Sequence, residues 1–307
     1  MRVFKGIDQY DRSEETCLTT GTFDGVHVGH RKIIDMFNGF AHKEGRRSVM
    51  LTFHPHPRKV LFPDDHGLEL LTTMEEKLEL LEQAGLDDVI IHPFSREFSR
   101  YTAVEYVRDL LVHGLHMKHM VIGYDHHFGR NRQGDIHQLR EMAPLYEFDV
   151  TEIAAKDIDD VNVSSTKIRQ ALQEGQVEVA NTYLGYKYSF RGNVVPGKSR
   201  GKEIGFPTAN IEVLDDTKLI PRNGVYAVDV RVQGAMHRGM MNIGHNPTFE
   251  NGMDKSIEVN LFDFDRDIYG QEIRVCLLKY LRAEQRYGNV DELTAQMKID
   301  QENARRL

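Results

Sequence analysis

Two glycine-rich stretches of this chain carry side chains whose types and spacing suit phosphate chemistry. The first covers residues 21–30, Gly-Thr-Phe-Asp-Gly-Val-His-Val-Gly-His, with His27 and His30 three positions apart. Its glycines permit close approach of the backbone, and free amides at the start of a following helix attract anions. We predict that both imidazoles face the phosphates of a nucleoside triphosphate and stabilise the charge that develops when α-phosphorus is attacked. Two surface histidines after a turn are the alternative.

A second candidate phosphate segment is Ser164-Ser165-Thr166, followed by Arg169. The hydroxyls lie where a helix is expected to begin, and the guanidinium comes about one turn later. Taken alone, three hydroxyl residues are an ordinary helix N-cap. The segment therefore gains its meaning only together with the first one.

The other glycine-rich stretch, residues 192–210, combines spaced glycines with basic residues and ends in Gly-Phe-Pro-Thr-Ala-Asn. Such a loop can wrap phosphates with backbone amides, although the motif GxxxxGK[ST] is absent. A glycine-rich surface loop is the alternative. Further along, Glu258 alternates with Ile257 and Val259, which turns its side chain away from those apolar neighbours. By this pattern alone, Glu258 is a solvent-facing carboxylate of a strand.

In the first half of the chain, short apolar runs alternate with longer amphipathic segments. Residues 74–84 and 103–112 have apolar side chains at helical spacing, whereas the runs are short enough to be buried strands. This βαβα pattern predicts a parallel sheet, which binds ligands at the carboxyl ends of its strands. The predicted strands are residues 17–23, 48–53, 88–91, 119–122 and 148–153.

The second half has a different pattern. After residue 186, apolar and polar residues alternate between Gly, Pro and Asn turns, which is typical of an antiparallel barrel or sandwich. Residues 290–306 suit a terminal helix packed on that barrel. We therefore predict two domains, residues 1–182 and 183–307. The predicted strands are residues 189–195, 226–232, 239–243, 256–262 and 272–280.

Length and composition agree with two soluble globular domains. The 307 residues are about twice the usual length of one domain, and the net charge of −8 offers no general attraction to nucleic acid or an anionic membrane. Cys17 and Cys276 lack CxxC spacing, and no apolar stretch approaches the roughly 20 residues that a spanning helix needs. We expect a cytoplasmic protein that binds small molecules rather than nucleic acid or membranes. The oligomeric state stays open.

The motif HxGH together with SSTxIR resembles the nucleotidyltransferase superfamily, in which both motifs hold ATP. The fuller GTFDGVHVGH resembles the bacterial FAD synthetases, and the resemblance continues through residues 52–57, 71–81 and 123–129. It implies a Rossmann-like nucleotidyltransferase domain with His27, His30 and Arg169 as catalytic residues. The implied ATP contacts are Gly21, Phe23, Asp24, Gly25, Ser164, Ser165 and Thr166, and the implied flavin contacts in this half are Asp125 and Phe128.

One departure from that family follows Asp125. The family often has an aromatic and a basic residue before Phe-Gly, where this chain has His126 and His127. These histidines, taken with His54 and His56, could suggest a metal site. No cysteine or clustered carboxylate accompanies them, so we expect loop structure instead.

The sequence GFPTAN resembles the riboflavin kinases residue for residue. The resemblance implies a β-barrel in which Thr208 and Asn210 bind Mg²⁺ and the phosphates of ATP. It assigns Glu258 as the base that accepts the proton of the riboflavin 5′-hydroxyl, and residues 281–287 resemble a flap that closes over flavin. The implied ATP contacts are Gly197, Gly205, Phe206, Pro207, Thr208 and Asn210, and the implied flavin contacts are Glu258, Arg282 and Tyr287.

Together the resemblances predict a bacterial-type bifunctional enzyme that phosphorylates riboflavin to FMN and adenylylates FMN to FAD, with ATP and Mg²⁺ in both steps. One alternative is a flavin carrier or regulator that has lost one or both activities, which would lack Glu258, Thr208 or a histidine of HxGH. Another is an RNA-linked enzyme, which should carry a KMSKS-like loop and a basic surface. A third is an adenylyltransferase whose barrel only binds, against which the complete PTAN and glutamate set argues.

Overall fold

The computed structural model describes residues 1–11, 13–64, 67–124, 126–154, 163–197, 201, 205–245 and 255–307, with only the backbone of His245. Its contacts divide the chain into two compact units, Met1–Val163 and Ser164–Leu307. This division lies before the predicted boundary at 182/183. The reason is that helices α8 (Ser165–Gln173) and α9 (Val177–Leu184) pack with the second unit. The Asn181 amide, for example, donates to the Leu277 carbonyl at 2.9 Å.

The first unit is built on a six-stranded, wholly parallel sheet, as the sequence predicted. Its strand order is β1-β4-β3-β2-β5-β6. The short edge strand β1 was not predicted, and β2 ends at Thr20, before the expected end at residue 23. The strands are β1 (Arg2–Phe4), β2 (Thr16–Thr20), β3 (Arg47–His54), β4 (Asp88–Pro93), β5 (Met117–Gly123) and β6 (Asp149–Ile153).

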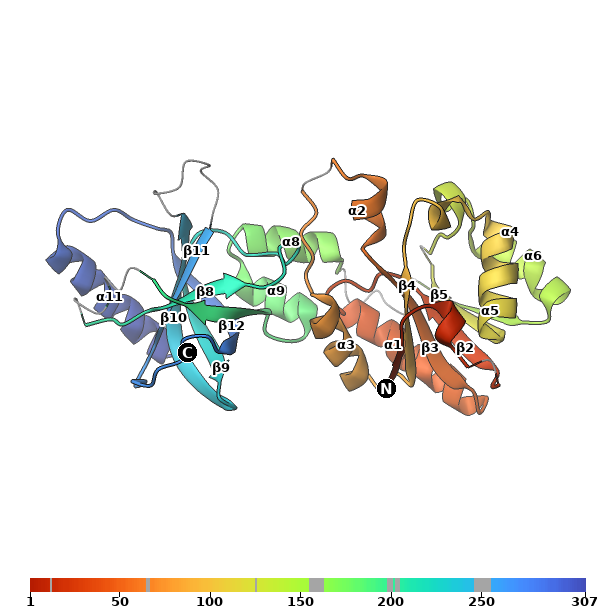
Figure 1. Cartoon of the computed structure of the whole chain (residues 1–307), viewed down its shortest axis with the longest axis horizontal. Coiled ribbons are helices and arrows are strands. Elements are labelled where there is room, and N and C mark those ends of the chain that lie inside the picture. Colours follow the sequence, from red (N-terminus) through yellow and green to blue (C-terminus); the bar gives the residue numbers. More distant parts are fainter. Residues whose placement is uncertain are drawn as a thin grey trace. The chain divides into compact units, whose positions relative to one another are not determined.

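Successive residues of each central strand enter opposite hydrophobic cores. Cys17 packs in one core and Leu18 in the other, and Val121 and Ile122 divide in the same way. Helices α1 (Val28–Lys43) and α3 (Met74–Gln83) cover one face of the sheet, and the segment from α4 to α6 covers the other (Figure 1). This burial on both faces explains why the strands are continuous apolar runs in the sequence.

The remaining helices of the first unit are short or interrupted. The predicted helix 103–112 is a continuous helical segment that changes from α4 (Ala103–Glu105) through a π-helical stretch, Tyr106–Val112, to α5 (His113–Leu115). Pro144 lies inside α6, and Asp135 caps its start. The others are α2 (Pro57–Leu61), α6 (Ile136–Tyr146) and single turns at Ile7–Gln9, Phe98–Arg100 and Arg130–Arg132.

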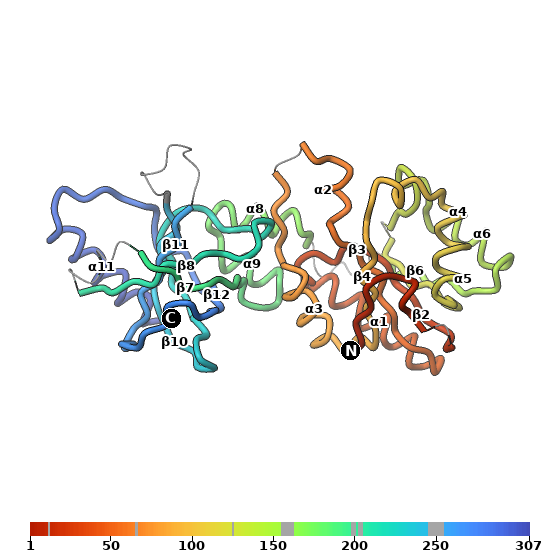
Figure 2. Tube along the Cα trace, in the orientation of Figure 1, coloured from red at the N-terminus to blue at the C-terminus, as the bar shows by residue number. Residues whose placement is uncertain are grey.

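The second unit is a closed antiparallel barrel of order β10-β11-β8-β7-β12-β9. Figure 2 shows the strands wound around one another, with the terminal helix α11 (Val290–Arg305) along their outside. The five predicted strands are present, and β8 adds one that begins at the end of the stretch interpreted as a phosphate loop. The strands are β7 (Ser189–Val195), β8 (Ala209–Val213), β9 (Gly224–Val232), β10 (Ala235–His245), β11 (Lys255–Leu261) and β12 (Glu272–Arg282). Among the described helices, none is long and apolar enough to cross a membrane.

Candidate active sites

The first glycine-rich stretch forms a tight loop between the carboxyl end of β2 and the start of α1. Phe23, Gly25 and Val26 have φ values of 45°, 83° and 37°, so three residues of this loop adopt left-handed backbone conformations. His27 caps α1, because its Nδ1 accepts the amide hydrogen of His30 at 3.3 Å. The predicted strand, loop and helix arrangement is therefore present, with the helix amides at the sheet edge where ligands bind.

The two histidines of the loop stack on each other, with ring centroids 3.6 Å apart. Burial lowers the pKa of His27 to about 4, although the charge of Asp24 raises it. Burial also lowers the pKa of His30 well below its ordinary value, and the charges of His27 and Lys77 lower it further. Both rings are therefore neutral near pH 7. Nδ1 of His30 is buried and has no hydrogen-bond partner among the described residues.

Asp24 fastens the loop to the segment that precedes α3. The side chain is only 3% exposed, and its two oxygens accept the backbone amides of Leu71 and Thr72, each at 3.1 Å. The Thr72 hydroxyl donates to Asp24 at 3.2 Å and accepts the amide of Gly25 at 3.2 Å. Both Asp24 oxygens thus hold protein groups of the loop base, which favours a positioning role over the predicted ATP contact.

The motif SSTxIR forms the start of α8. The Ser164 hydroxyl caps this helix by accepting the amide of Lys167 at 3.3 Å. Ser165 and Thr166 occupy the first turn, and Arg169 follows on the second. Because α8 belongs to the second unit and HxGH to the first, convergence of the two motifs on one ATP molecule stays a prediction.

Of the two predicted flavin contacts in the first unit, Asp125 lies outside the described residues. Phe128 is buried and stacks on Tyr106, with centroids 5.7 Å apart. Its backbone pairs with Gly134, where a Cβ would meet the Phe128 ring at 2.5 Å. A ring packed in this way supports neighbouring side chains more than it offers an open face for contact with flavin.

The barrel brings the predicted kinase residues together. The Thr208 hydroxyl donates to Oε2 of Glu258 at 3.2 Å, and Asn210 lies directly opposite Glu258 in the pairing of β8 with β11. Side chains of directly opposed residues share one face of a sheet, so oxygens of all three residues meet there. Gly197 contacts the Asn210 amide so closely that any Cβ at residue 197 would overlap it. A larger residue there would force the Asn210 side chain to move.

Residues of the GFPTAN sequence itself fix the backbone that leads to this cluster. Gly205 has φ 83°, and Phe206 is buried in the small core beneath α11. The Pro207 carbonyl accepts a hydrogen bond from the buried Asn260 amide at 2.7 Å. Asn260, two positions after Glu258 on the same strand face, was not among the predicted site residues.

The predicted flap residues interact with the terminal helix. Arg282 donates to the Asp300 carboxylate from Nε at 3.0 Å and from Nη2 at 2.7 Å, and Asp300 is only 2% exposed. The Arg282 guanidinium also lies over the Tyr287 ring, 5.8 Å from its centroid. The structure thus places both predicted flavin contacts side by side. Asp300, which was not among the predicted site residues, holds the Arg282 guanidinium.

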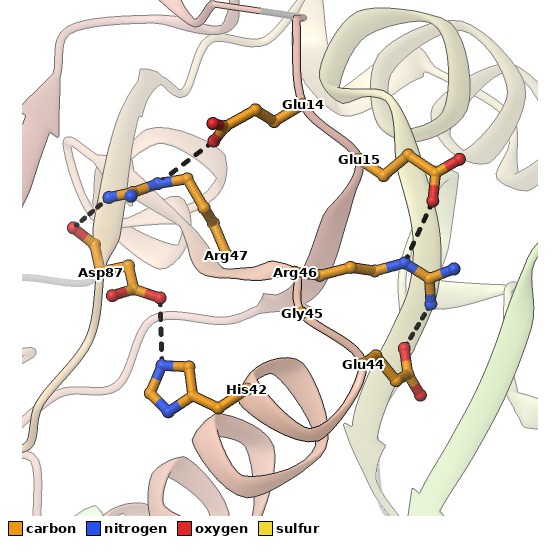
Figure 3. Close-up of a pocket in the computed structure, with 8 residues that line it drawn as sticks. All are labelled: Glu14, Glu15, His42, Glu44, Gly45, Arg46, Arg47 and Asp87. Carbon is orange, nitrogen blue, oxygen red and sulfur yellow. Dashed lines mark hydrogen bonds and ion pairs between the residues drawn. The ribbon is translucent and has the colours of Figure 1, made fainter.

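One charged cavity of the first unit lies away from its phosphate loop. It has a volume of about 570 Å³ and is bordered by residues at or just before the starts of β2, β3 and β4, together with His42 of α1 (Figure 3). Arg46 pairs with Glu15 and Glu44, and Arg47 lies 3.9 Å from Glu14. These are the amino ends of parallel strands, opposite the edge that carries the phosphate loop. Among the described residues, no group of histidine, cysteine and acidic side chains has the arrangement of a metal site.

Comparisons with known proteins agree with this arrangement. A family model described as FAD synthetase matches residues 9–167, and one described as riboflavin kinase matches residues 184–307. A bifunctional riboflavin kinase/FMN adenylyltransferase of Listeria monocytogenes is 39% identical over 94% of this chain and 91% of its own length. The protein of the same name from Escherichia coli is 38% identical over 99% of this chain and 97% of its own length.

Among solved structures, one described as a macrolide-efflux protein from Streptococcus pneumoniae has a TM-score of 0.90 and 32% identity, over 99% of this chain and 98% of that one. Its similarity extends over both units of the present chain. With two family models that together match most of the sequence and relatives similar over nearly its whole length, the chain belongs to the family of bifunctional riboflavin kinase/FMN adenylyltransferases.

Proposed function

We propose that the two reactions of flavin cofactor synthesis are carried by separate sets of residues, one in each half of the chain. The enzyme converts riboflavin to FMN and FMN to FAD, with one ATP consumed in each step. The observation that carries the assignment is the hydrogen-bonded cluster of Thr208 and Glu258, with Asn210 opposite, in the barrel that matches the riboflavin kinases.

In the kinase reaction, the 5′-hydroxyl of riboflavin attacks the γ-phosphorus of ATP, and ADP leaves. Glu258 accepts the hydroxyl proton, because its carboxylate is half-buried beside the hydroxyl of Thr208 and faces away from the barrel core. The hydrogen bond from Thr208 orients the carboxylate. Arg282, held by Asp300, contacts the isoalloxazine together with Tyr287.

Magnesium fits the same cluster. Thr208 and Asn210 present hydroxyl and amide oxygens, which are hard ligands that Mg²⁺ accepts, and the ion would share the phosphate oxygens of ATP. Bound there, it would neutralise charge on the phosphates. The backbone near Gly197 and Gly205 binds the rest of the triphosphate.

In the adenylyl transfer, the phosphate of FMN attacks the α-phosphorus of a second ATP, and pyrophosphate leaves. The phosphate nucleophile is already ionised near neutral pH, so no general base is required. Neutral His27 and His30 at the start of α1 donate hydrogen bonds to the phosphoryl oxygens, where they are most effective as negative charge grows in the transition state. Arg169 adds a positive charge.

The assignment of overall activity is tested by incubating the purified chain with riboflavin, ATP and Mg²⁺ and separating the flavins by chromatography. FMN should appear first and FAD should follow. A protein that bound riboflavin without forming either product would instead be a carrier. Formation of FMN without FAD would support only the assignment of riboflavin kinase activity to the barrel.

The proposal also covers the setting of the enzyme. Its substrates are small molecules, and the net charge of −8 gives no general attraction to nucleic acid. Cys17 is buried, and both cysteines are free thiols, as suits the reducing cytoplasm. Cell fractionation with an antibody to the chain tests this location, and recovery with membranes would contradict it.

A further inference from the structure

A buried lysine lies at the base of the phosphate loop, outside the HxGH and SSTxIR motifs. Lys77 is the fourth residue of α3 and is only 5% exposed. Lysine is almost never buried without a partner, because an ammonium loses its hydration inside a protein. Lys77 nevertheless makes no hydrogen bond or ion pair within the described part of the chain, so its position needs an explanation.

The local structure directs attention to the loop. Asp24 binds the amides of Leu71 and Thr72, and Thr73 caps α3 through the amide of Glu76 at 3.2 Å. Lys77 therefore follows within about one helical turn of the residues that hold the loop. The ammonium of Lys77 interacts electrostatically with the carboxylate of Asp24. It also lowers the pKa of His30. No ion pair within 4 Å joins it to Asp24, whose oxygens hold the backbone at residues 71 and 72.

Beside the start of α1, Nδ1 of His30 is buried without a hydrogen-bond partner among the described residues, and Lys77, only 5% exposed, forms no hydrogen bond or ion pair with them. Helix α1 has 16 residues, and its first amides carry partial positive charge toward the same loop. A cation, a hydrogen-bonding imidazole and a helix N-terminus together form a site for a multiply charged anion.

We propose that Lys77 binds the pyrophosphate portion of ATP during adenylyl transfer, as a substrate-binding residue additional to the HxGH histidines. The inference rests on the proposed function of this half. Asp24 positions the loop, and Lys77 gains its missing partner when the triphosphate is bound. The same contact holds the leaving pyrophosphate, so the strength of product inhibition depends on it.

Lys77→Met tests the proposal, since methionine fills similar space without the charge. With FMN supplied, the KM for ATP in FAD formation and the inhibition constant for inorganic pyrophosphate should both rise by about 10- to 100-fold, the effect of one charge-assisted hydrogen bond. Lys77→Arg should retain part of the binding. Riboflavin phosphorylation by the same protein should be unchanged. Lys43→Met, which removes an exposed lysine at the end of α1, is the matched control and should behave like the parent.

A double variant distinguishes phosphate binding by Lys77 from simple neutralisation of the Asp24 charge by Lys77. The pair Asp24→Asn with Lys77→Met leaves no uncompensated carboxylate and remains usable if Lys77→Met alone fails to fold. If Lys77 served only Asp24, this pair would match Asp24→Asn alone in ATP KM and pyrophosphate inhibition, which overturns the proposal. If the double variant still binds ATP and pyrophosphate more weakly than Asp24→Asn alone, the proposal is supported.

If the parent formed no FAD from FMN, the proposed function would fail. If the parent formed FAD and Lys77→Met matched it in both constants, only the role of Lys77 would fail.

Discussion

At the scale of single residues, some functional side chains can be recognised from a sequence motif, whereas others can be recognised only from their place in the fold. Glu258, Thr208 and Asn210 could be named from the sequence, because GFPTAN is distinctive and the structure then brings their side chains together. Lys77 and Asp300 could not. Each lies in an amphipathic helix among other charged residues, and only burial distinguishes it from a solvated neighbour.

The glutamate of the barrel provides the first residue-scale prediction. Glu258→Gln keeps the side-chain shape and the partner of Thr208 but removes the proton acceptor, so FMN formation should fall by about 10²- to 10⁴-fold. Conversion of supplied FMN to FAD should continue near the parental rate. Steady-state assays with riboflavin and with FMN measure the two steps separately. Riboflavin phosphorylation near the parental rate would show that another group accepts the proton.

At the scale of elements, the apolar runs and helical periods located most of the sheet, because strands buried on both faces differ clearly from amphipathic helices. Two short strands were not predicted from the sequence. The edge strand β1 has only three residues, and β8 directly follows glycines and Pro207 that indicate a loop. Strand β8 forms because residues 209–213 pair with β7 and β11, long-range contacts that local sequence does not encode.

The edge strand β1 is held by a buried charge. Asp88 is fully buried, and its carboxylate accepts bonds from Arg2 at 2.7 Å, Arg47 at 2.6 Å and the Tyr10 hydroxyl at 3.1 Å. Burial raises the pKa of Asp88, but the two guanidinium groups outweigh it and lower the value to about 2. The carboxylate therefore ties β1 and β3 to β4 while it is ionised.

Removing that charge should destabilise the first unit. Asp88→Asn is expected to lower the free energy of unfolding by about 2 kcal/mol near pH 7, below the full value for a buried pair because Arg2 keeps solvent contact. The unfolded carboxyl has a pKa of about 3.9. Since the folded value is lower, the contribution is fully present above about pH 4 and is lost as the pH falls toward 2.

Urea unfolding of the parent and the variant at pH 7, 5, 4 and 3 measures this effect. The difference between them should stay constant from pH 7 to 5 and shrink below pH 4. Asp149→Asn, at an exposed position that begins β6, is the matched control. A difference that grew on acidification would mean that the Asp88 pKa is raised rather than lowered.

At the scale of the whole molecule, the division into a nucleotidyltransferase half and a kinase half could be predicted from the change in residue pattern. The boundary at 182/183 stays a prediction, because contacts group helices α8 and α9 with the second unit, whereas the riboflavin kinase model begins at residue 184. Both helices have amphipathic patterns that suit either neighbour. Leu172 and Leu184 are buried, and Asn181 of α9 bonds to both Leu277 and Tyr188 of the second unit.

Two fragments test where the kinase half begins. The fragment of residues 164–307 should fold and phosphorylate riboflavin, because it contains the whole barrel cluster and both packing helices. The fragment of residues 183–307 has the same cluster but lacks the Asn181 bonds, and it should melt lower by about 5 °C or more. Circular dichroism and a kinase assay provide the comparison. Equal melting temperatures would place α8 and α9 outside the kinase unit.

The central claim is that two sets of residues perform two successive reactions, and a time course of riboflavin, FMN and FAD for His30→Ala beside the parent tests it most directly. His30 lies in the first turn of α1 and stacks on His27, so its loss removes a donor to the transition state of adenylyl transfer only. With ATP and Mg²⁺ saturating, FAD formation should fall by about 10²- to 10³-fold, and FMN should accumulate at the parental rate. Unchanged FAD output, or loss of both products from a variant that is still folded, would contradict the account.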